Sequence, residues 1–73
     1  MSKLPQVSGP ELVRALEKLG FSVRRQHGSH IIMRRNDPYA QTVVPNQRQI
    51  DRGTLRAILR QIGVTPEDLA SLL

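Results

Sequence analysis

The feature that most constrains the fold of this chain is the placement of its helix signals, which lie toward both ends and leave the middle free. Near the start, Ser8 can cap a helix and Glu11 stands three residues later, as in a capping box. In the second half, Asp51 can cap a helix over about residues 52–62, and Thr65 can start a further short helix. The apolar residues expected at helical spacing after these starts are Leu12, Val13, Leu16 and Leu19, then Leu55, Ile58, Leu59 and Ile62, then Leu69, Leu72 and Leu73.

The middle of the chain contains three strand patterns. They span residues 21–25, 29–35 and 41–44. We expect a turn at His27–Gly28 and a loop over Asn36–Tyr39, because both segments are rich in turn-forming residues. The order is then α-β-β-β-α with a short C-terminal helix. Its simplest packing is a single α+β domain over residues 1–73, in which two helices lie on one face of a three-stranded antiparallel sheet. The other face can be open to water.

Alternation along the strands assigns side chains to the two faces of this sheet. In the first strand, Phe21 and Val23 are expected to face inward. The second strand has three consecutive apolar residues, so its phase is ambiguous. We prefer Ile31 and Met33 inward. The residues that this choice leaves on the open face are His30, Ile32 and Arg34.

Composition excludes several classes of protein. A chain of 73 residues is one small domain, which buries only about 60% of the surface of its unfolded form. The absence of cysteine excludes a disulfide scaffold and a cysteine-ligated zinc site. Two histidines fall short of the ligands that a metal needs, so we expect no metal and no small-molecule cofactor. No apolar run approaches the ~20 residues of a membrane span, and the start does not resemble a signal peptide. A cytoplasmic protein is expected.

The charge of the chain points to an anionic partner. Eleven Lys and Arg against six Asp and Glu give a net charge of +5 and a pI near 11.2. Such a balance favours a nucleic acid or an acidic protein as the partner. Nine of the eleven bases are arginine, which binds phosphate and carboxylate in two-point geometry. Genome composition can explain the excess of arginine over lysine, but it does not explain the net charge.

The triplet Gly28-Ser29-His30 is the candidate catalytic segment. Glycine lets a backbone approach a ligand closely, serine offers a hydroxyl and an N–H group, and unperturbed histidine titrates near pH ~6.5. Together with nearby cations, this suits general acid–base catalysis at a phosphodiester. The flanking arginines that would bind RNA are Arg24, Arg25, Arg34 and Arg35. Alone, the triplet is a weak motif, and an ordinary surface or core histidine is the simpler interpretation of His30. His27 is a possible second proton donor, although a solvated turn residue is the simpler interpretation.

Three arginines of the second helix form a separate signal. Arg52, Arg56 and Arg60 recur every four residues and therefore share one face of the helix. Like charges at this spacing repel, which indicates an anionic partner, either phosphates or an acidic protein. The alternative is a solvated face that pairs with Glu67 or Asp68.

Four segments of the chain resemble the HicA (YcfA-like) toxin family. They are Leu16–Phe21, Arg25–His30, Val43–Pro45 and Gly53–Gln61, within a resemblance that runs from Ser8 to about Leu69. The resemblance implies a small mRNA interferase with a fold like that of double-stranded-RNA-binding domains. It also implies a HicB antitoxin as partner and no requirement for a metal.

The same resemblance assigns the essential histidine of the family's Gly-Ser-His motif to His30. The chain departs from the pattern at Gln47, where many relatives carry a histidine two residues after valine-proline. We therefore expect an mRNA endoribonuclease that uses His30 as general base or acid. The other interpretation is a non-catalytic RNA-binding module of the same fold. A surface for an acidic antitoxin is compatible with either.

Overall fold

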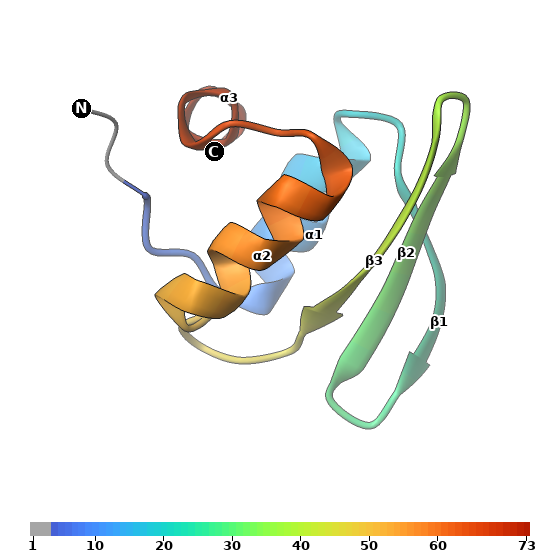
Figure 1. Ribbon diagram of the computed structural model, residues 1–73. Helices are drawn as coiled ribbons and strands as arrows, with labels where there is room; N and C mark the ends of the chain where they lie inside the picture. The colour runs from blue at the N-terminus through green and yellow to red at the C-terminus, as the bar shows by residue number, and fades with distance from the viewer. Residues whose placement is uncertain (1–3) are drawn as a thin grey trace.

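The order of helices and strands is the one that the sequence predicts. The computed structural model describes residues 4–73 (Figure 1). Its elements are α1 (Gly9–Glu17), β1 (Ser22–His27), β2 (His30–Asn36), β3 (Tyr39–Pro45), α2 (Arg52–Ile62) and α3 (Pro66–Leu72). The strands form one antiparallel sheet in the order β1-β2-β3. Helices α1 and α2 lie on one side of the sheet, and no described element covers the other side (Figure 1). The predicted α+β architecture is confirmed.

Capping interactions start the helices where the sequence places them. The Ser8 hydroxyl accepts a hydrogen bond from the Glu11 N–H group at 3.1 Å, and the Glu11 carboxylate accepts one from the Ser8 N–H group at 2.8 Å. The Asp51 carboxylate caps α2 by accepting from two backbone N–H groups. A second capping box joins Thr65 and Asp68 at the start of α3. These bonds satisfy N–H groups that have no partner inside a helix.

The core lies between the helices and one face of the sheet. In β2, Ile31 and Met33 are buried, which confirms the preferred phase of this strand. Val44 of β3 and the predicted apolar residues of α2 face the same core. Helix α3 contributes Leu69, whereas Leu73, expected to pack beside it, is 53% exposed because it lies beyond the end of the helix.

The first hairpin differs from its predicted form. Because β1 extends to His27 and β2 begins at His30, the turn is Gly28-Ser29, and the predicted turn at His27–Gly28 was wrong by one residue. Gly28 has a φ of 56°, and Ser29 has no positive φ. This combination matches the type II′ turn, which favours glycine at its first central position.

Two further predictions about the strands need correction. Val23 lies opposite the buried Met33, as expected for an inward residue, but it remains 44% exposed. The reason is an open recess of about 320 Å³ between Val23 and Val13 of α1, which no side chain fills. The predicted loop over Asn36–Tyr39 is shorter than expected. Its outer residues pair with each other as the ends of β2 and β3.

The N-terminal end of α1 touches the connector that follows β3. The Gly9 N–H group donates to the Gln47 carbonyl at 2.8 Å. A Cβ atom at Gly9 would lie only 2.8 Å from the Cα atom of Asn46 and would also collide with the Pro45 carbonyl. Only glycine therefore fits at this position without moving the connector.

Candidate active site

The register of the strands arranges the side chains of the uncovered face in rows. Cross-strand partners point to the same side of a sheet and have neighbouring Cβ atoms. We call this surface the open face. Its three rows are His27–His30–Pro45, then Arg25–Ile32–Val43, then Ser22–Arg34–Gln41. The first row lies at the end of the sheet that carries the Gly28-Ser29 turn.

His30 begins the central strand and has a strand on either side. Its backbone pairs with His27 of β1 and with Pro45 of β3, while its side chain is exposed. The adjacent turn is fixed by two hydrogen bonds. The Ser29 carbonyl accepts from the Asn46 N–H group at 2.6 Å, and the Gln26 amide donates to the Gly28 carbonyl at 3.0 Å. An ordered backbone therefore presents an accessible imidazole.

His27 lies directly beside His30 on the open face. The two residues close the hairpin, so their Cβ atoms are about 5 Å apart. They are the two histidines of the whole chain. The sequence interpretation treated His27 as part of the turn and missed this pairing. The signal that could have shown it is the two-residue spacing around Gly-Ser, which is the length of a tight hairpin loop.

The four arginines predicted to flank this segment do not gather in one place. Arg25 lies in the second row, next to the histidines, and Arg24 lies at a β-bulge in the edge strand. Arg34 shares the open face with His30 but is four residues, or about 13 Å, farther along β2. Arg35 lies on the helix side of the sheet.

Arg35 is held by contacts within the fold. Its Nε atom donates to the Pro38 carbonyl at 2.9 Å, and its Nη1 atom donates to the Leu19 carbonyl at 3.2 Å. Its guanidinium also lies 4.6 Å from the centre of the Phe21 ring, a cation–π distance. This arginine joins β2 to the end of α1, and the structure does not bring it to the histidines.

The arginines of α2 form a second basic surface, on the helix layer. Arg52, Arg56 and Arg60 are all exposed, and the opposite side of α2 is buried. We call these three residues the arginine stripe. Two of them border a groove of about 340 Å³ between α2 and α3. The other residues of the groove are Leu4, Leu59, Val64, Thr65 and Pro66. An apolar groove with cationic edges suits a partner that offers both acidic and apolar side chains.

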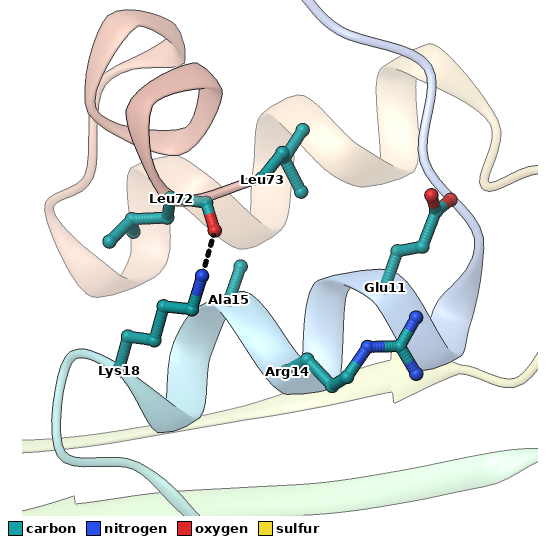
Figure 2. A pocket seen from close by; sticks show the side chains of 6 residues that line it. All are labelled: Glu11, Arg14, Ala15, Lys18, Leu72 and Leu73. Atoms are coloured by element: carbon teal, nitrogen blue, oxygen red, sulfur yellow. Dashed lines mark hydrogen bonds between the residues drawn. The ribbon is translucent and has the colours of Figure 1, made fainter.

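A smaller pocket of about 180 Å³ lies between α1 and α3 (Figure 2). The Lys18 ammonium group donates to the Leu72 carbonyl at 2.7 Å across it. Glu11 lines the pocket, but its carboxylate caps α1. The backbone and side-chain hydrogen bonds with Ser8 lower the pKa of Glu11, and the nearby Arg14 adds to this effect. Figure 2 shows α1 between this pocket and the sheet, so the pocket is separate from the open face.

The fold and the open face together define a class of protein, and a family match then places the chain within it. A small basic α+β domain with histidines and arginines on an uncovered sheet face has the features of a protein that binds a polyanion. The family model described as HicA toxin of bacterial toxin-antitoxin matches residues 9–64. The chain therefore belongs to the HicA toxin family, and its role is that of a toxin with an antitoxin partner. No curated protein matches the chain.

The structure describes residues 4–73. Among these residues, no group of three or more His, Cys, Asp or Glu side chains is placed to hold a metal ion. No helix in the same range is long and apolar enough to cross a membrane.

Proposed function

We propose that this toxin is an mRNA endoribonuclease of the cytoplasm that needs no metal and uses His30 for proton transfer. The observation that carries the proposal is the position of His30. It is exposed at the head of the central strand, in an ordered backbone, on an uncovered sheet face that also carries arginines. The Gly28-Ser29 turn beside it leaves room for a phosphodiester backbone to approach.

The proposed reaction is an attack of the ribose 2′-OH on the adjacent 3′ phosphate. A base removes the 2′-OH proton while the 2′ oxygen forms its bond to phosphorus. The bond between phosphorus and the 5′ oxygen then breaks, and an acid protonates the leaving oxygen. Imidazole can perform either transfer, and such help contributes roughly 10²- to 10⁴-fold in rate. Arg25, in the neighbouring row, supplies positive charge to the crowded phosphorane.

The geometry favours His30 over His27 as the essential residue. His30 belongs to the central strand and is fixed from both sides, whereas His27 ends an edge strand. A proton-transfer group gains from a fixed position because small displacements reduce the rate strongly. His27 is close enough to assist, but its position is less constrained.

Replacement of each histidine tests this assignment. We expect His30→Ala to lower RNA cleavage by at least ~10²-fold and His27→Ala to lower it much less. Both variants should retain wild-type far-UV circular dichroism, since both side chains are exposed. Wild-type cleavage by folded His30→Ala protein would reject the catalytic role of His30. RNA binding by the wild-type protein without any cleavage would identify a non-catalytic RNA-binding module.

The reaction products test the mechanism independently. Cleavage should persist in excess EDTA and leave a 2′,3′-cyclic or 3′ phosphate opposite a 5′ hydroxyl. A DNA of the same sequence should remain intact because it lacks the 2′-OH nucleophile. A 5′ phosphate product, or strict dependence on a divalent ion, would contradict the proposed chemistry.

The antitoxin in this proposal is a HicB-like acidic protein that binds the arginine stripe. The support is the exposure of the stripe, its charge, and the apolar groove along Arg56 and Arg60. The Arg56→Gln/Arg60→Gln double variant should weaken the antitoxin complex and leave RNA affinity unchanged. Arg14→Gln/Arg48→Gln removes equal charge elsewhere and is the matched control.

Two other results with the Arg56→Gln/Arg60→Gln variant would assign the arginine stripe a different role. If the stripe binds phosphates instead, RNA affinity falls and the log–log salt slope decreases by roughly 0.7 for each lost contact. If neither partner responds, the stripe is a solvated face.

A further inference from the structure

Arg34 is a half-buried cation on the open face that lacks a complete set of hydrogen-bond partners. Its Nε atom is buried, and residues 4–73 supply no acceptor for it. Its neighbours in the third row, Ser22 and Gln41, have polar side chains, yet neither accepts a hydrogen bond from this Nε atom. A buried polar atom without a partner calls for an explanation, and a bound ion is one of the standard ones.

The next residue in the chain shows that this is not a general property of arginines in the fold. Arg35 has carbonyl acceptors for both Nε and Nη1 and an aromatic ring beneath its guanidinium. The fold therefore satisfies the arginine on its helix side. It leaves Arg34 on the side where an external anion can reach the exposed part of the residue.

The distance between Arg34 and His30 determines which phosphate Arg34 can meet. The two residues are on the same face of β2, about 13 Å apart along the strand. This exceeds the separation of neighbouring phosphates in an RNA strand. Between them lie Ile32, which is half-buried, and Val43, which is 44% exposed. Strand side chains stand roughly perpendicular to the sheet, so a phosphate above His30 lies well away from one above Arg34. The surface between the two residues is apolar.

We propose that Arg34 forms a phosphate subsite for single-stranded RNA, beyond the phosphates adjacent to the scissile one, with the intervening nucleotides across Ile32 and Val43. The inference rests on the proposed function, because it takes His30 as the position of the scissile phosphate. The ligand atoms are the non-bridging oxygens of one phosphodiester, which guanidinium groups bind in two-point geometry.

The test combines a substitution in the protein with a substitution in the RNA and asks whether their effects on kcat/KM are independent. The substrates are short chimeras built around a cleavage site mapped in a long RNA. One ribonucleotide in otherwise DNA sequence fixes the cleavage position. An uncharged methylphosphonate replaces each phosphate in turn. For wild-type protein, one substitution away from the cleavage site should lower kcat/KM by about tenfold, typical for loss of a charged hydrogen bond.

Arg34→Gln should lower kcat/KM by a similar factor with the unmodified chimera. With the methylphosphonate at the critical position, it should cause no further loss. At the other positions the two effects should multiply. Arg14→Gln, which removes the same charge from α1 on the far side of the sheet, should show independent effects at every position. Independent effects for Arg34→Gln at all positions, or coupling at the scissile phosphate, would overturn the subsite.

Two further variants keep the outcome clear. Arg34→Lys retains the charge without the two-point geometry. It should keep part of the dependence of kcat/KM on the critical phosphate. This variant keeps the proposal testable if Arg34→Gln folds poorly. His30→Ala with the same chimera tests the proposed function separately. Cleavage at the wild-type rate by that variant would reject the catalytic proposal. If His30→Ala abolishes cleavage but the effects of Arg34→Gln and the methylphosphonates are independent at every position, the subsite alone is rejected.

Discussion

The helix-covered face and the open face of the sheet are built from alternate residues of the same three strands. On the covered face, Met33 and Val44 are fully buried against the helices. On the open face, the adjacent residue Val43 is 44% exposed, and Ile32 is half-buried. In β2 and β3 the sequence is apolar on both sides at these points, so the helices decide which side becomes core. Stability should therefore depend on one face and RNA chemistry on the other.

The largest effect that separates the two faces is expected from adjacent residues of β2. Met33→Ala should destabilise the fold by about 2–5 kcal/mol, because it removes a fully buried side chain and leaves a cavity. Ile32→Ala should cost less than half as much. Denaturant unfolding of both variants measures the difference. Equal losses of stability would show that the open face also belongs to the core.

A smaller difference is expected between the two adjacent arginines. Arg35→Gln should lower the free energy of unfolding by roughly 1–2 kcal/mol, because it removes two hydrogen bonds from a charged group that is partly exposed. Arg34→Gln should leave stability near the wild-type value. Thermal unfolding of the two variants, which lose the same charge, provides the comparison. A larger loss at Arg34 would contradict the division between the faces.

The smallest effect on stability is expected from the pH dependence of Glu11, which belongs to the helix layer. Hydrogen bonds with Ser8 lower the pKa of Glu11 below its ordinary value of 4.5. Its contribution to stability is therefore present above pH 4.5 and is lost as the pH falls through the lowered pKa of the folded state. Glu11→Gln should be less stable than wild type near neutral pH, and this difference should shrink in acid. Unfolding curves at several pH values for both proteins test the sign. A difference that grows in acid would contradict it.

Local signals explain how much of this structure the sequence could predict. The capping residues Ser8, Asp51 and Thr65 start the three helices as expected, because a cap acts within three residues of itself. The phase of β2 was ambiguous in the sequence, and the preferred one, with Ile31 and Met33 inward, is confirmed. The α+β architecture then followed from the order of the elements.

The parts that could not be predicted depend on pairing between strands or on distant contacts. The position of the first turn decides that His27 stands beside His30, and a shift of one residue hides this pair. The contacts of Arg35 join residues that are 3 and 16 positions apart in the chain. The exposure of Val23 depends on a space beside α1 that its own strand does not reveal.

The contact between Gly9 and the connector has a consequence for the dynamics of the protein. Asn46 holds the turn beside His30 through the Ser29 carbonyl, and its neighbour Gln47 accepts a hydrogen bond from the first residue of α1. We therefore expect fraying of the first turn of α1 to loosen the connector that supports the histidine. Amide protons on both sides of this contact should exchange with solvent through one shared opening event. An antitoxin or a mutation that stabilises the start of α1 would then keep the distant hairpin ordered as well.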